Sequence, residues 1–176
     1  MTQRQTILAI ASGGGHWHQL LRLSSSLPDD RTIYASPLLK TAAGAPGRRY
    51  HRIADGNRDT KLRLAIVTVQ LAWLLLRHRP GYIISTGAAP GCLALIMGRW
   101  IGAKGLFIDS VANARELTMS ARLAKKHGIT VYSQWPEVAE REGVAYAGSV
   151  FEGLVGLTTN TDETDGQPKG KREAAA

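Results

Sequence analysis

Residues 6–16 have the sequence TILAIASGGGH, and this stretch decides the fold. Its first six residues form a short, mostly apolar run that stops just before three glycines, which is typical of a buried strand in a parallel sheet. Residues 16–27 then place leucines along one face of a helix. The stretch therefore predicts a strand, a glycine turn and a helix, which together form the first unit of an α/β fold.

The rest of the chain alternates between short apolar segments and longer segments with helical periodicity. We predict strands near residues 32–36, 50–53, 81–85, 105–109, 129–133 and 144–147, and helices near residues 62–76, 91–101, 116–127 and 137–142. This order predicts one Rossmann-like domain over residues 1–155, an α/β fold with a parallel sheet and helices on both faces. Residues 41–59 are expected to be mainly loop. Residues 156–176 are expected to be a disordered tail, because they contain almost no large apolar side chain.

Composition limits the class of protein further. The chain has 176 residues, of which 44% are hydrophobic and 20% charged, so it can bury a sizeable core. A single cysteine excludes an internal disulfide, and we predict no metal site. The first residues do not resemble an export signal, and no segment reaches the about 20 apolar residues of an ordinary spanning helix. We therefore expect a chain that works in the reducing environment of the cytosol.

The charge is strongly uneven. The net charge is +8, and residues 1–108 contain 14 Lys and Arg but only four acids. Such a surface attracts nucleic acid, anionic lipid or phosphorylated substrates, although simple solubility also explains a basic chain. We predict no nucleic-acid partner, because neither interleaved aromatic and basic residues nor a helix-turn-helix pattern is present.

The glycine loop after the first strand is a candidate anion site, formed by Ser12, Gly13, Gly14 and Gly15. Glycines let a ligand approach the backbone closely, and the N–H groups at a helix N-terminus bind anions. The loop matches neither the dinucleotide fingerprint nor the Walker A motif, and a tight strand–helix turn explains it equally well. His16, at the head of the helix, is a candidate general base or phosphate ligand, and its alternative role is a cap or a solvated turn residue.

A second loop of small residues follows the strand expected near residues 81–85. Ser85, Thr86 and Gly87 offer donors without bulk, and two such loops at the carboxyl ends of strands predict a shared phosphate-binding cleft. Asp109 ends another strand on the same edge of the sheet, as a base or hydroxyl acceptor or as a cap for the segment that follows. Arg115 either reaches a phosphate or lies on a solvated face.

The helix expected at residues 62–76 is apolar nearly all round, since 12 of its 15 residues are apolar. A helix on a sheet needs only about a third of its circumference apolar, so this one must also bury its outer face. Basic residues bracket it, which suits an anionic membrane surface. Burial against a protein partner or within the core is the alternative. The residues expected to contact the membrane are Leu62, Leu71, Trp73, Leu74 and Trp100.

Several segments, taken in order, resemble a known family. They are ASGGGHWHQLLRL, IISTGAAPGCLALIMGRWIGAKGLFIDS, ANARELTMSARLAKK, TVYSQWPEVAE and YAGSVF, and they cover about residues 7–151. Together they resemble the acceptor-side subunit of two-part UDP-sugar glycosyltransferases. One branch of that family anchors the second GlcNAc transfer onto dolichol-linked sugar, and the other makes bacterial exopolysaccharide and capsule. The glycine loop that ends in histidine is also similar, more distantly, to that of the MurG family.

The resemblance implies a half-enzyme. Its fold would be the N-terminal half of a GT-B glycosyltransferase, which faces the membrane and holds a lipid-linked sugar acceptor. A separate small subunit would bind the UDP-sugar, so this chain would bind no cofactor itself. The three loop glycines and residues 85–87 would line the acceptor diphosphate site, and His16 and Asp109 would be the candidate bases. The expected location is peripheral, on the cytoplasmic face of the inner membrane. The alternative function is a non-catalytic anchor that recruits the catalytic subunit.

Overall fold

The computed structural model describes residues 5–40, 43–44, 47–56 and 61–151. Within these ranges, the strands form one sheet in the order β3-β2-β1-β4-β5-β6-β7, and each pair of neighbours is parallel. This is the strand order of a Rossmann-like sheet with one further strand. The strands are β1 (Ile7–Ile10), β2 (Thr32–Ser36), β3 (Arg49–Arg52), β4 (Tyr82–Ser85), β5 (Lys104–Ile108), β6 (Thr130–Ser133) and β7 (Ala145–Tyr146).

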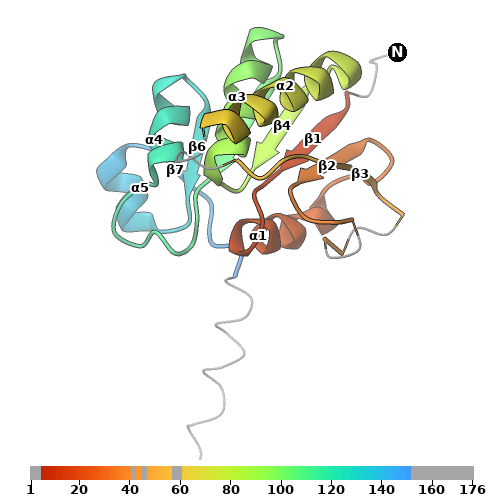
Figure 1. Ribbon diagram of the computed structural model, residues 1–176. Helices are drawn as coiled ribbons and strands as arrows, with labels where there is room; N and C mark the ends of the chain where they lie inside the picture. The colour runs from red at the N-terminus through yellow and green to blue at the C-terminus, as the bar shows by residue number, and fades with distance from the viewer. Residues whose placement is uncertain (1–4, 41–42, 45–46, 57–60, 152–176) are drawn as a thin grey trace, which may run out of the picture.

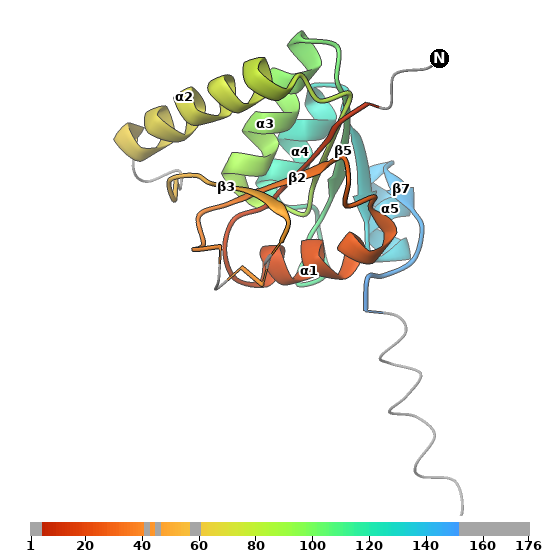
Figure 2. The ribbon, with the colours of Figure 1, turned by 90° about the vertical axis from the view of Figure 1, so that its right-hand side faces the viewer.

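Helices cover both faces of the sheet (Figure 1). They are α1 (Gly15–Leu23), followed by a 3₁₀ turn at Ser24–Ser26, α2 (Lys61–His78), α3 (Ala88–Trp100), α4 (Met119–Lys126) and α5 (Pro136–Glu142). α1 lies on one face, where Trp17 and Leu20 are fully buried in a cluster with Tyr34. α2, α3 and α4 lie on the opposite face, over the larger apolar cluster around Leu95 and Phe107 (Figure 2). The predicted α/β fold is confirmed.

The strand order reverses between β1 and β4. These two strands are neighbours, and Ile10 at the end of β1 is in register with Ser85 at the end of β4. β1 continues into α1 and then β2 on one side, whereas β4 continues into α3 and then β5 on the other. The loops after β1 and β4 therefore meet at the topological switch point, where open α/β sheets bind ligands.

The expected elements are all present, with boundaries that differ by a few residues. α1 ends at Leu23, four residues before the predicted end, and α4 begins at Met119 although periodicity placed its start at residue 116. Thr118 is its N-cap, and the Thr118 side chain accepts a hydrogen bond from the backbone N–H of Ala121. Parts of the loop expected at residues 41–59, and the whole tail expected at residues 156–176, lie outside the described residues.

α2 divides its apolar residues between two faces. Leu71 and Leu74 are 0% and 2% exposed and pack in the core, so the expectation that they contact a membrane is wrong. The opposite side forms the α2 outer face, which consists of Leu62, Ile66, Val69, Trp73 and Leu76. These positions recur every three or four residues and therefore share one side of the helix. No helix in the described ranges is long and apolar enough to cross a membrane.

A leucine-to-alanine substitution should change the free energy of unfolding differently on the two faces of α2. Leu71→Ala removes buried methyl groups and leaves a cavity, so it should lower the free energy of unfolding by about 2–5 kcal/mol. Leu76→Ala changes a side chain that is 66% exposed and should stay within about 0.5 kcal/mol of the wild type. Urea denaturation followed by circular dichroism measures both values. Equal losses in the two variants would contradict this placement of the helix.

Candidate functional site

The candidate site lies at the switch point, where the N-terminal ends of α1 and α3 come close together. Each of these two helices has a glycine as its N-cap. The N-cap of α1 is Gly14, with φ of 68°, and the N-cap of α3 is Gly87, with φ of 138°. Both φ values lie in the region that favours glycine. No side chain among the described residues caps the N-terminal N–H groups of either helix. The start of α1 is exposed at Gly14 and Gly15, whereas Gly87 at the start of α3 is buried against the His16 ring. The exposed positive end of α1, close to that of α3, suits an anion.

His16 joins the two loops. Its ring Nδ1 lies 2.9 Å from the carbonyl oxygen of Thr86, and the Thr86 hydroxyl donates in return to the carbonyl oxygen of His16 at 2.6 Å. A carbonyl oxygen can only accept, so Nδ1 carries the proton in this contact. In the neutral ring Nε2 is then the unprotonated nitrogen, which can accept a proton from a bound hydroxyl. The half-buried His16 is therefore oriented as a general base.

The contact between His16 and Thr86 requires a glycine at position 87, both because of its backbone conformation and because there is no room for a side chain. A Cβ at position 87 would overlap the His16 ring, principally at Nδ1. Gly91, one turn further along α3, is equally confined, because a Cβ there would overlap the hydroxyl of Ser85. α3 therefore approaches the ends of β1 and β4 more closely than any side chain at these two positions would permit.

Ser85 and Thr86 do not present their side chains to a ligand. Both residues are 0% exposed. The Ser85 hydroxyl accepts from the Gly87 N–H at 3.2 Å, and the Thr86 hydroxyl is used by His16. Their hydroxyls are therefore not available to a phosphate in this structure. They hold the loop in shape, while the exposed backbone of Gly14 and Gly15 remains accessible.

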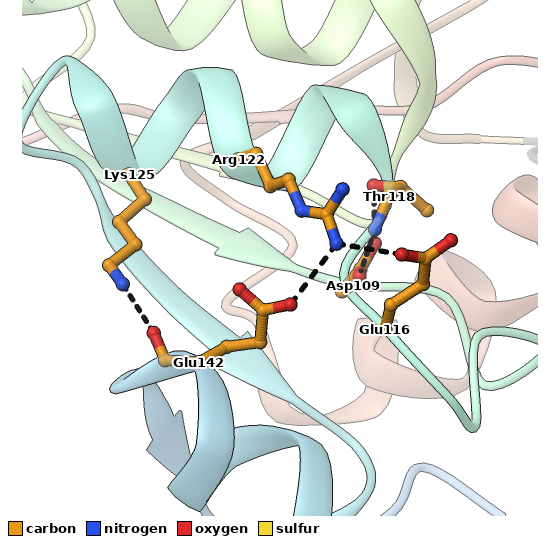
Figure 3. Close-up of polar contacts among 6 residues, drawn as sticks. All are labelled: Asp109, Glu116, Thr118, Arg122, Lys125 and Glu142. Atoms are coloured by element: carbon orange, nitrogen blue, oxygen red, sulfur yellow. Dashed lines mark hydrogen bonds and ion pairs between the residues drawn. The ribbon is translucent and has the colours of Figure 1, made fainter.

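Asp109 is also a structural residue. It is 2% exposed, and both of its carboxylate oxygens accept hydrogen bonds from Thr118, one from the backbone N–H at 2.8 Å and one from the hydroxyl at 2.7 Å. Figure 3 shows this contact at the start of α4. Asp109 thus fixes the segment that follows β5, which was the alternative to a base role. This arrangement does not support the base role expected for Asp109, because the carboxylate is buried and both of its oxygens already accept hydrogen bonds.

A buried amide network that the sequence reasoning missed lies at the same edge of the sheet. Gln134, in the QWPE segment, donates to the side-chain oxygen of Gln19 at 2.7 Å and to the backbone oxygen of Asp109 at 2.8 Å. Its own side-chain oxygen accepts from the N–H of Val150 at 3.0 Å and from the hydroxyl of Ser149 at 3.2 Å. Local sequence carries no signal for this pair, because Gln19 stands between His18 and Leu20 and Gln134 lies 115 residues away. A buried polar group needs partners, and these two supply each other.

Ion pairs tie α4 to its neighbours next to the site (Figure 3). The Arg122 guanidinium contacts Glu116 at 2.8 Å and Glu142 at 3.1 Å, and Lys125 donates to the backbone oxygen of Glu142. Arg115 is exposed on the segment between β5 and α4, where it can contact either solvent or a ligand. In the described part of the chain, no three His, Cys, Asp or Glu side chains are grouped as metal ligands.

The α2 outer face lies on the side of the sheet that α2, α3 and α4 cover. Its five apolar side chains are between 45% and 77% exposed, and Trp100, at the end of α3, is 78% exposed. Arg63, Arg77 and Arg79 are exposed near the two ends of α2. At one end the Trp73 ring meets His51 and His78, whose Nε2 atoms lie 3.2 Å apart. Burial lowers the pKa of both histidines, and for His78 the nearby cationic groups lower it further, so the positive charge of this surface comes from arginine.

Comparisons with solved structures agree with this fold. MurG from Acinetobacter baumannii superposes with a TM-score of 0.58 at 10% identity, over 76% of this chain and 43% of that one. The UDP-N-acetylglucosamine 2-epimerase from Rickettsia bellii superposes with a TM-score of 0.61 at 12% identity, over 91% of this chain and 50% of that one. The UDP-GlcNAc 2-epimerase from Methanocaldococcus jannaschii gives 0.55 at 13% identity, over 81% and 45%. No protein-family model and no curated protein sequence matches the chain.

These likenesses establish the architecture. The chain has the Rossmann-like fold found in one half of GT-B proteins such as MurG and the epimerases. It spans about half the length of the solved structures that it matches. At 10–13% identity the likeness concerns the fold alone, so the function of the site depends on its own geometry.

The contact between His16 and Thr86 predicts a specific tautomer. In the neutral protein, ¹H–¹⁵N NMR of the histidine rings should show the proton of His16 on Nδ1. Gly87→Ala should displace the ring and abolish this preference, because the new methyl group occupies its place. Gly15→Ala is the matched control, since a Cβ there has no neighbour within 4 Å. A wild-type His16 that is protonated on Nε2 would contradict the proposed orientation.

Proposed function

We propose that the chain is the acceptor-binding and membrane-docking subunit of a split glycosyltransferase. In this proposal a separate small subunit binds a UDP-sugar, and the sugar is transferred to a lipid-diphosphate acceptor during exopolysaccharide or capsule synthesis. The observation that carries the proposal is the contact of His16 Nδ1 with the Thr86 carbonyl, which leaves Nε2 for a substrate beside the starts of α1 and α3. In this proposal His16 would act as the base for a sugar hydroxyl, and the neighbouring helix N-termini would bind a diphosphate.

The chemistry divides between the two chains. The N–H groups at the starts of α1 and α3 would bind the acceptor diphosphate, and His16 Nε2 would remove the proton of the attacking hydroxyl. The oxygen then attacks the anomeric carbon of the donor sugar, and the bond from that carbon to UDP breaks. The departing UDP would be stabilised by the partner subunit. Its interface is expected at the carboxyl ends of the strands, where donor and acceptor must meet. The similarity in fold to MurG, over about half of that chain, supports this division.

The α2 outer face supports a peripheral location on the cytoplasmic face of the inner membrane. Exposed apolar side chains flanked by arginines match a surface that enters the interfacial region of an anionic bilayer. Leu62, Trp73 and Trp100 remain as proposed membrane contacts, because they are 77%, 55% and 78% exposed. If this face contacts the membrane, the chain would be held at the surface in which its lipid-linked acceptor lies.

A non-catalytic anchor is the second candidate function. It is favoured by the burial of Asp109, which leaves a single base candidate of the two that the sequence suggested. In that case the chain would recruit the catalytic subunit through the same membrane surface, and the glycine loops would serve only the fold.

Reconstitution with the UDP-sugar-binding partner tests the proposal. Membranes that contain both chains should transfer label from a UDP-sugar to lipid, and membranes that contain either chain alone should not. His16→Gln should lower the rate by about 10²–10⁴-fold, because it removes the base. His18→Gln, in an exposed residue of the same helix, is the matched control and should leave the rate unchanged.

Each of the other outcomes has a distinct meaning. Transfer by this chain alone would show a donor site within it and contradict the half-enzyme. Full activity of His16→Gln would favour the anchor function, provided that the two chains still purify together.

Membrane docking has its own test, which is flotation with liposomes. The chain should float with vesicles that contain anionic lipid and should float less at high salt, because screening weakens its arginine contacts. Val69→Glu combined with Trp73→Glu should abolish flotation by placing carboxylates on the α2 outer face. Tyr146→Glu, at a similarly exposed position on β7, should float like the wild type. Failure of the wild type to float with either neutral or anionic vesicles would reject docking by this face.

A further inference from the structure

A groove lies among α2, α3 and α4, the three helices on the opposite face of the sheet from α1. Its volume is about 400 Å³. Figure 2 shows α2 and α3 diverging toward the N-terminal end of α2. Its apolar lining comes from Leu64 of α2, from Ala89, Cys92 and Leu93 of α3, and from Met119 and Leu123 of α4.

The wall of the groove is apolar. Six of its nine lining residues are aliphatic side chains, a methionine or a thiol, and Cys92, which is 2% exposed, donates a hydrogen bond to the backbone oxygen of Ser120. Burial raises the pKa of the Cys92 thiol to about 11, so the thiol remains uncharged at neutral pH. The Arg122 guanidinium is drawn aside by Glu116 and Glu142. The groove therefore suits a hydrocarbon and offers little to a polar ligand.

The position of the groove links it to the anion site. Ala89 lies two residues after Gly87, whose backbone faces the His16 ring, so the groove begins beside the N-terminus of α3. Met119 follows Thr118, which is held by Asp109. On the other side Leu64 belongs to the same helix as the α2 outer face. The groove thus runs between the loops of the candidate site and the proposed membrane surface.

We infer that this groove binds the diphosphate-proximal part of an isoprenoid chain, while the attached diphosphate lies at the starts of α1 and α3. The identity of the ligand rests on the proposed function. A volume of about 400 Å³ is in the range of small-molecule sites, of roughly 300–1,000 Å³. The same volume holds only about one turn of a protein helix, which measures about 10–12 Å across with its side chains. An apolar chain joined to an anionic head matches an apolar groove that ends at positive helix termini.

Soluble probes separate the chain from its head group without a bilayer. Farnesyl diphosphate should bind the full-length chain at least about tenfold more tightly than inorganic diphosphate, because burial of even two methylene-sized groups supplies that gain. Isothermal titration calorimetry measures both affinities.

Two substitutions in the groove test where the chain binds. Leu123→Glu places a carboxylate in the wall at a position that is 43% exposed, so the fold should tolerate it. It should remove the advantage of farnesyl diphosphate over inorganic diphosphate. Ala89→Leu should do the same by filling the groove without adding charge. Tyr146→Glu, outside the groove on β7 and equally 43% exposed, is the matched control and should keep the advantage.

Three outcomes would overturn the inference. The first is that the wild type binds farnesyl diphosphate and inorganic diphosphate with equal affinity, and the second is that both groove variants still prefer farnesyl diphosphate. The third is that the groove variants lose vesicle binding although the wild type does not bind farnesyl diphosphate. The last would mean that a bilayer chain occupies the groove. Failure of the proposed function is distinguishable, because groove-dependent binding of farnesyl diphosphate without any sugar transfer would reject the function and retain the groove.

Discussion

The imidazole of His16 and the backbone of Thr86 bind each other in both directions, and the arrangement of the site depends on this pair. The ring N–H reaches the Thr86 carbonyl, and the Thr86 hydroxyl reaches the carbonyl of His16. The two residues belong to loops 70 positions apart in sequence that the sheet brings to neighbouring strand ends. Because both hydrogen bonds connect a side chain with a backbone group, they fix the two loops relative to each other and the orientation of the ring.

A second layer of buried polar contacts supports this pair. Gln134 connects α1 through Gln19, the end of β5 through the backbone of Asp109, and the last described segment through Val150. An amide has donors and an acceptor, so one buried side chain can join three elements that the sheet alone leaves separate. Asp109 fixes the next segment through Thr118. The carboxyl edge of the sheet is thus held by groups that are themselves inaccessible, and the backbone of the glycine loop remains exposed above them.

Much of the fold could be predicted from the sequence, because strand and helix periods differ and the order of elements limits the topology. The chemical roles were harder to predict. A helix that is apolar all round, such as α2, gives no sign of which leucines face the sheet, so Leu71 and Leu74 were placed on the wrong side. Asp109 at a strand end has the same local sequence whether it serves a substrate or caps the next segment, and only its contact with Thr118 decides. Gln19 and Gln134 are 115 residues apart, and no local pattern connects them.

The single cysteine also gives the chain a practical property. Cys92 is enclosed by α3 and α4 and keeps its proton at neutral pH, so it is a poor nucleophile. A cysteine introduced at an exposed position would consequently be the one reactive thiol in the chain, with no need to remove the native residue. Spin labels or fluorophores could thus report the depth and tilt of the molecule at a bilayer from a background that is chemically silent.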